Sequence, residues 1–373
     1  MKPFLTALLV LIFACGAASP LSAEGFSEIV EKGIAEYDLG ILEDNLPRVT
    51  EENADKLGIS LDINGIDEVF DPWTLIKGIG KCLLLCMKDT VGLICAACVL
   101  SLLGFVVREL STPSPQAARI CEIVSVLSCS CLLYKNVSFT VSGMKTVLDS
   151  LSGYVTAAMP VTLGLISASG RPSLAASSGT LIYTAVSILG TVLVTFVPAL
   201  VNTCFCLASM SAVSDNAAFN GVTASLKKIA VGVITFIYFI FTGIGGINTL
   251  VTAGSDTLAR KSIKYAAGTY IPVAGGYIAD GLDVWFASVE NLRNSSGIFG
   301  IAVVSITVAV PLCGIASGYF ASTICGAVFS LGGNSSSEKF LGTVRDVYSI
   351  MFSMLCGYGI MLCALFAFMM KGV

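Results

Sequence analysis

Cysteines and carboxylates are the residues that could do chemistry in this chain, because its 373 residues include 14 cysteines and no histidine. The absence of histidine excludes Ser-His-Asp and Cys-His catalysis, histidine metal ligands and a histidine pH switch. Cys95 and Cys98 have the spacing of a metal or redox site, but no second pair or nearby acid accompanies them. Most cysteines lie in apolar runs, which favours a role as small packing residues.

Phosphate and ion chemistry have equally little support. The stretch Gly78–Cys82 lacks the spacing and the hydroxyl group of a nucleotide-binding loop. Asp149, Asp280 and Asp283 are carboxylates expected near membrane depth, and an interfacial position explains them better than a proton or ion path does. The sequence therefore predicts a protein that is not an enzyme and has no cofactor, no catalytic residue and no metal site.

The composition is that of an integral membrane protein. Hydrophobic residues make up 55% of the chain and charged residues only 12%, and the mean hydropathy is +0.86. The formal net charge is −4 and no basic stripe is present, so nucleic acid is excluded as a partner. The first expected partner is the lipid bilayer itself.

Apolar runs of about 20 residues predict an all-α, polytopic membrane protein. Seven spans are expected, and six to eight remain open. The third candidate contains Asp149 and Pro160, and the sixth contains Pro311, which would produce either one kinked helix or a hairpin. The seven candidates are Thr90–Val107, Ile120–Val141, Ser152–Ser169, Thr180–Val201, Ile229–Val251, Ile298–Tyr319 and Tyr348–Met370.

Three segments precede the membrane domain, which we place at residues 90–373. Residues 1–23 have the charged start, the short apolar run and the small-residue end of a signal peptide, with an uncleaved anchor as the alternative. Residues 24–70 form an acidic extracytoplasmic region with short helices, which either docks on the membrane domain or a partner or remains a solvated leader. In residues 71–89, Asp71 and Pro72 begin an amphipathic interfacial helix.

The segment 264–294 is too polar for a span and too apolar for an exposed loop. Glycine and proline break its first part, so we expect irregular backbone sheltered by protein or trapped water. Helical spacing of Leu282, Trp285, Phe286, Val289 and Leu292 then predicts an amphipathic helix. An interfacial connector and a re-entrant element that lines a cavity or a partner surface both remain open. The candidate functional residues are Gly268, Pro272, Gly275, Gly276, Asp280, Gly281 and Asp283.

The same segment carries a family resemblance. The run Ile271-Pro-Val-Ala-Gly-Gly-Tyr-Ile-Ala-Asp280, preceded by Lys264-Tyr265 and followed by Asn294–Gly300, resembles the stage III sporulation protein AE family of endospore-forming bacteria. The order of signal, acidic region and spans agrees across nearly the whole chain. The resemblance implies a multi-pass protein of the mother-cell membrane around the forespore. It also implies partners among other stage III proteins, in a channel-like or secretion-like complex that sustains late forespore gene expression.

Two features concern helix packing and the alternative function. Small residues at four-residue intervals predict a helix-packing face inside a bundle or between subunits, which leaves a homo-oligomer open; they are Gly314, Gly318, Ser322 and Gly326. Gly332–Ser337 is expected to be a flexible linker.

The alternative function is a self-contained permease with a discontinuous-helix site at residues 268–283.

Basic residues give a weak orientation signal. With the N-terminal region outside the cytoplasm and seven spans, the region Arg108–Arg119 is expected inside. Lys227 and Lys228 are then expected outside the cytoplasm. This is a poor fit, because membrane proteins carry an excess of positive charge in their cytoplasmic loops.

Overall fold

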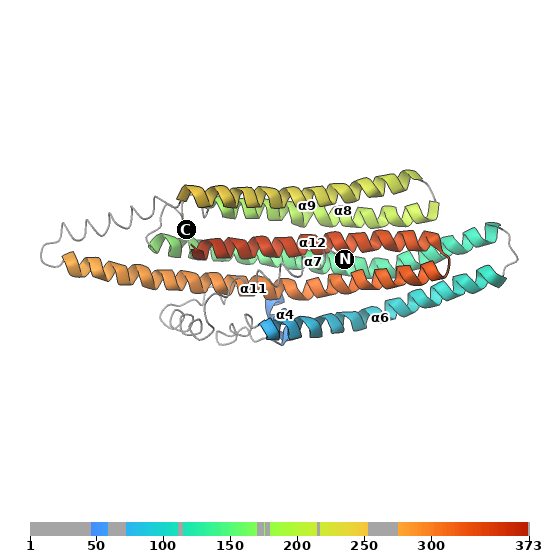
Figure 1. Ribbon diagram of the computed structural model, residues 1–373, viewed down its shortest axis with the longest axis horizontal. Coiled ribbons are helices and arrows are strands. Elements are labelled where there is room, and N and C mark those ends of the chain that lie inside the picture. Colours follow the sequence, from blue (N-terminus) through green and yellow to red (C-terminus); the bar gives the residue numbers. More distant parts are fainter. Residues whose placement is uncertain are drawn as a thin grey trace.

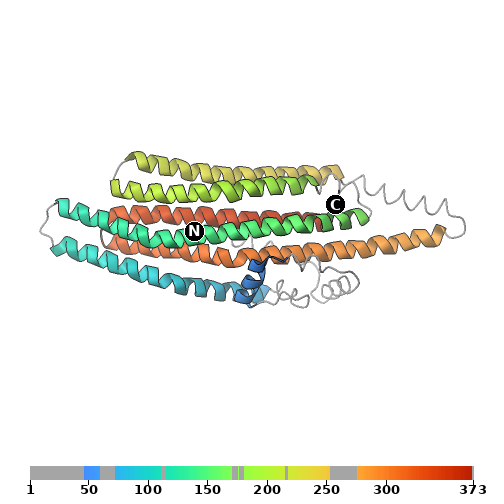
Figure 2. The same cartoon turned by 180° about the vertical axis from the view of Figure 1, so that it is seen from behind.

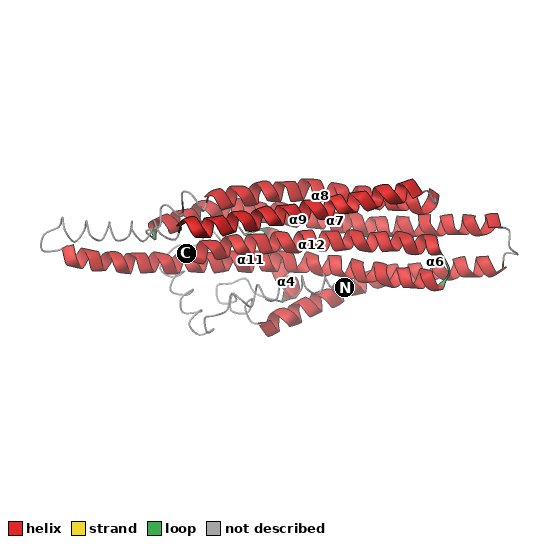
Figure 3. Cartoon of the chain, turned by 45° about the horizontal axis from the view of Figure 1, so that its top comes forward, coloured by secondary structure: helices red, strands yellow, loops and turns green. Residues whose placement is uncertain are grey.

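The computed structural model describes residues 46–58, 72–110, 115–169, 175, 180–214, 217–252 and 275–371; of residues 275–295 it describes the backbone alone. Every element in these ranges is a helix, as Figure 3 shows, so the predicted all-α class is confirmed. The helices are α4 (Arg48–Leu57), α6 (Pro72–Leu110), α7 (Pro115–Ala168), α8 (Thr180–Ser214), α9 (Ala217–Thr252), α11 (Gly275–Leu331) and α12 (Ser335–Lys371).

Six of these helices are long and apolar enough to cross a membrane, which confirms a polytopic protein at the lower end of the expected range. The separation of the second and third predicted spans is wrong, because α7 runs through both without a break. Its polar middle keeps one apolar side, where Met144, Leu148 and Leu151 are buried. One buried face is enough to continue a helix.

The six long helices form three antiparallel pairs, namely α6 with α7, α8 with α9, and α11 with α12 (Figure 1). In each pair, the first helix ends and the second begins at the same end of the bundle. The expectation that Arg108–Arg119 and Lys227–Lys228 lie on opposite sides is therefore wrong. Because α7 is one continuous helix, the chain has one membrane crossing fewer than predicted. Lys227 and Lys228 therefore lie on the same side as Arg119.

The two proline- and glycine-containing segments differ from expectation. α11 begins at Gly275 and is unbroken to Leu331, so Gly275, Gly276 and Gly281 are helical, and the hairpin alternative at Pro311 is wrong. Gly268 and Pro272 lie outside the described residues. Residues 332–334 are a tight turn and residues 335–337 already belong to α12, so the expected flexible linker is wrong. Gly333 adopts a φ of 70°, and the Asn334 side chain accepts a hydrogen bond of 3.1 Å from the Ser337 amide at the start of α12.

The core is built around α12, which packs against α11, α8, α7 and α9. Its side chains Tyr348, Leu355, Leu362 and Phe366 are almost completely buried. The short helix α4 lies against α11 and α6, so part of the acidic N-terminal region docks on the membrane domain. α4 ends at Gly58 in the left-handed region, with a φ of 72°.

Candidate functional site

The predicted small-residue face lies in the contact between α11 and α12. A Cβ atom on Gly318 would overlap the ring of Tyr348, and one on Gly326 would lie 3.7 Å from the Cβ of Leu341. Ser322 is buried and donates a hydrogen bond of 2.9 Å to the Tyr319 carbonyl. A Cβ on Gly314 would have no atom of the described structure within 4 Å, apart from those of its own helical turn. The structure thus uses most of this face inside the chain.

Three further glycines, in α12 or in helices next to it, have an aromatic ring packed against them. A Cβ on Gly300 of α11 would lie 2.6 Å from the ring of Phe366, and one on Gly190 of α8 would lie 3.0 Å from the ring of Tyr358. Gly357 of α12 itself receives Tyr238 from α9. These close approaches place three neighbouring helices at fixed heights along α12.

Hydrogen bonds complete two of these aromatic contacts. The Tyr348 hydroxyl donates to Asn136 Oδ1 of α7 over 2.9 Å. The Tyr238 hydroxyl donates to the Met354 carbonyl over 3.0 Å. Because an unpaired hydroxyl is costly in an apolar interior, these bonds fix α7 and α9 as well as α11 against α12.

The docking site of α4 is a carbonyl that Pro311 leaves without its helical donor. Proline has no N–H, so the carbonyl of Thr307, four residues earlier in α11, loses its usual partner. The side-chain amide of Asn53 donates to this carbonyl over 3.0 Å. The hydroxyls of Thr50 and Thr307 also share a hydrogen bond of 2.7 Å. All three side chains are buried, so α4 is held by polar bonds inside an apolar helix layer.

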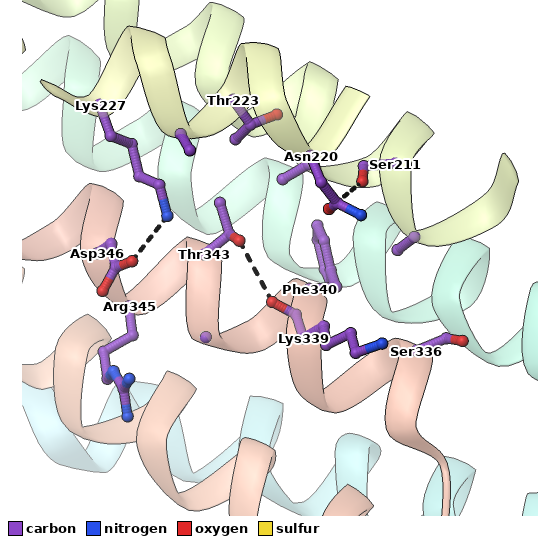
Figure 4. A pocket seen from close by; sticks show the side chains of 14 residues that line it. Ser211, Asn220, Thr223, Lys227, Ser336, Lys339, Phe340, Thr343, Arg345 and Asp346 are labelled. Carbon is purple, nitrogen blue, oxygen red and sulfur yellow. Dashed lines mark hydrogen bonds and ion pairs between the residues drawn. The ribbon is translucent and has the colours of Figure 1, made fainter. Parts of the chain in front are cut away.

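A polar pocket lies between α12 and the α8–α9 pair, toward the end where the chain turns (Figure 4). Its volume is about 470 Å³. Lys227 Nζ donates to Asp346 Oδ2 over 2.8 Å, and Ser211 donates to the amide oxygen of Asn220. Lys339 and Arg345 add positive charge at its edge. The lining is therefore polar, with three basic side chains and one carboxylate.

The ion pair in this pocket gives a prediction. Replacing Lys227 by Gln should lower stability by about 0.5–1 kcal/mol, because Asp346 keeps its charge without a partner, and high salt should shrink the difference. Thermal unfolding of the purified full-length protein measures this effect. The matched control is Lys228→Gln, since Lys228 is exposed and carries the same charge one residue along. Equal effects of the two substitutions would show that the pair contributes nothing.

The predicted functional segment is only partly placed. Gly275, Gly276, Asp280, Gly281 and Asp283 lie in the first turns of α11, where the backbone alone is described.

Sequence reasoning missed the bond from Asn53 to Thr307 and the pair Lys227–Asp346. Two signals for them were present: Pro311 marks an unpaired carbonyl four residues earlier, and Lys227 and Asp346 are opposite charges inside long apolar helices. In the described ranges, no three histidine, cysteine, aspartate or glutamate side chains come together as a metal site.

Comparisons with known proteins identify a family. A family model described as "Stage III sporulation protein AE (spore_III_AE)" matches residues 61–372. One curated relative, "Stage III sporulation protein AE" of Bacillus subtilis (strain 168), is 24% identical over 215 residues. The aligned part covers 55% of this chain and 54% of the relative, so it spans about half the length of that protein. No solved structure matches the chain.

Proposed function

Because the chain belongs to the stage III sporulation protein AE family, we propose that it is a non-enzymatic membrane subunit of a channel-like or secretion-like complex between mother cell and forespore. The observation that carries this proposal is the match of the family model to residues 61–372, which include all six long apolar helices. A role in sporulation and a multi-pass membrane location follow from these two facts. The complex, the membrane and the partners are our proposal.

In this proposal the protein lies in the mother-cell membrane that surrounds the forespore. Its partners are other stage III sporulation proteins, and the assembly sustains late forespore gene expression after engulfment. The N-terminal acidic region lies outside the cytoplasm. The docking of α4 on α11 and α6 supports an acidic region that is attached to the membrane domain rather than free.

The architecture favours a structural subunit over a self-contained permease. The centre of the described bundle is filled by α12 and its aromatic contacts with glycine. Segment 264–294 stays a candidate contact for a partner or a cavity lining.

A deletion strain of the host bacterium tests the proposal. We expect normal vegetative growth, completed engulfment, and then arrest with low late forespore transcription and few spores. Complementation with the full-length gene is the control for effects on neighbouring genes. Normal sporulation combined with a defect in uptake, export or growth would contradict the proposal and favour the permease.

A further inference from the structure

The outward side of α7 carries a line of polar residues, which we name the polar stripe. Its members recur every three or four residues, and all of them are exposed; they are Ser138, Ser142, Lys145, Asp149, Ser152 and Thr156. This spacing puts them on one helix face. Eighteen residues of helix are about 27 Å long, which is close to the thickness of the hydrocarbon core of a bilayer.

Two contacts fix the height of the polar stripe in the bundle. Asn136 accepts the hydrogen bond from Tyr348, and the ring of Tyr154 lies 6.1 Å from the ring of Phe366. Residues 136–154 of α7 therefore run beside residues 348–366 of α12. The contacts of Gly318 with Tyr348 and of Gly300 with Phe366 place residues 300–318 of α11 at the same height.

These heights coincide with the two most apolar predicted spans of the C-terminal part, Ile298–Tyr319 and Tyr348–Met370. Lys145 and Asp149 consequently lie near the middle of those spans, yet both are exposed on the surface of the single chain. Charged side chains at the centre of a bilayer face a bundle interior or a water-filled cavity. Within a bilayer at the level of these spans, lipid would therefore not cover this side of α7.

The opposite side of the bundle is apolar at the same height. Tyr238 of α9 bonds to the Met354 carbonyl, and Ser142 is level with residue 354 because Asn136 is level with Tyr348. Next to Tyr238, Phe239 is 73% exposed and Phe236 is 63% exposed. At this one level of the bundle, α9 thus exposes aromatic rings and α7 exposes polar groups. We expect this if α9 faces lipid and α7 faces water.

α4 independently marks the water side. It binds Thr307, which lies within the same height, and its outer residues Glu51, Glu52 and Asp55 are exposed. In Figure 2, α7 (green) and α4 (blue) both lie on the near side of the bundle. Two elements far apart in the sequence, both with exposed charged residues, are therefore on one side of the bundle.

We propose that the polar stripe and the outer side of α4 line a water-filled passage through the membrane, which further copies of this chain complete. A single chain leaves the stripe open on one side. Exposed Ile188 and Val192 of α8, which packs against α7, provide an apolar rim for contact between copies.

This inference rests on the proposed function, since it gives the proposed complex its passage. The experiment compares Ser142→Cys with Phe239→Cys, two exposed positions at one height on opposite sides of the bundle. Full-length protein in sheared membranes from sporulating cells, open to reagent from both faces, is treated with a water-soluble cationic methanethiosulfonate. Modification is read at each residue by mass spectrometry, so that the native cysteines do not interfere. Co-purification of two differently tagged copies is measured in parallel.

We expect Ser142→Cys to react about 100-fold faster than Phe239→Cys, because the charged reagent enters the water side and not the lipid. We also expect the two tagged copies to purify together.

Equal fast reaction at both positions would show that this level lies outside the bilayer and would overturn the passage. Slow reaction at Ser142→Cys would show a dry or covered stripe, with the same consequence. Fast reaction at Ser142→Cys without co-purification would overturn the role of further copies. None of these outcomes changes the deletion phenotype, so a failure of the passage is distinguishable from a failure of the proposed function.

Discussion

Replacing Gly318 by Leu should destabilise the protein by about 1–3 kcal/mol or more, because overpacking a filled core forces neighbouring groups to shift. A Cβ at this position already overlaps the ring of Tyr348, and that ring is 1% exposed and has no free space to enter. Displacement of the ring would also break the bond from its hydroxyl to Asn136. The substitution therefore disturbs the contacts of α12 with both α11 and α7. Thermal unfolding of the purified full-length protein measures the loss.

Gly314→Leu is the matched control for this prediction. Gly314 lies one turn earlier on the same helix, and a Cβ there meets nothing within 4 Å in the described structure. The two substitutions change helix propensity and apolar area equally, so their difference reports the contact with Tyr348. If Gly318→Leu and Gly314→Leu unfolded at the same temperature, the close approach of α11 to α12 at this point would be refuted.

Replacing Asn53 by Ala should cost about 1–3 kcal/mol, because the buried Thr307 carbonyl loses the donor that replaces the missing amide of Pro311. The same change in a Pro311→Ala background should cost less by about 1 kcal/mol or more, since residue 311 then supplies the helical donor itself. Unfolding of the four proteins in this cycle gives the coupling. Proteolysis of the region around α4 reports whether the helix remains docked.

The control for this cycle is Glu52→Ala, which changes an exposed residue beside Asn53. It should leave stability unchanged in both backgrounds. Equal costs of Asn53→Ala with and without Pro311 would mean that the proline does not create the docking site. The bond from Asn53 to Thr307 would then be incidental to the attachment of α4.

The sequence predicted the membrane helices well because burial in lipid requires long apolar runs, which composition reveals directly. α7 shows where this reasoning fails. Residues 144–158 alternate between buried Met144, Leu148 and Leu151 and exposed Lys145 and Asp149. A search for twenty apolar residues treats such a stretch as an interruption, whereas a helix needs one apolar face only. The number of crossings therefore depended on packing partners that the sequence does not specify.

The candidate site was predictable only in part for a similar reason. Small residues at Gly318 and Gly326 indicated a packing face, but not whether the partner was α12 or another subunit. Pro311 indicated a carbonyl without a donor, but the donor, Asn53, lies more than 250 residues earlier in the chain. Long-range pairs of this kind depend on the tertiary fold, which local spacing does not determine.

Removal of the protein after engulfment tests the central claim most directly. A degradation tag would be triggered once the forespore is fully engulfed, and a late forespore transcriptional reporter would be followed in single cells. The account predicts that reporter activity stops rising in the engulfed forespore, whereas an untagged strain given the same trigger continues normally. Continued normal rise of the reporter after complete loss of the protein would contradict a role in sustaining the forespore.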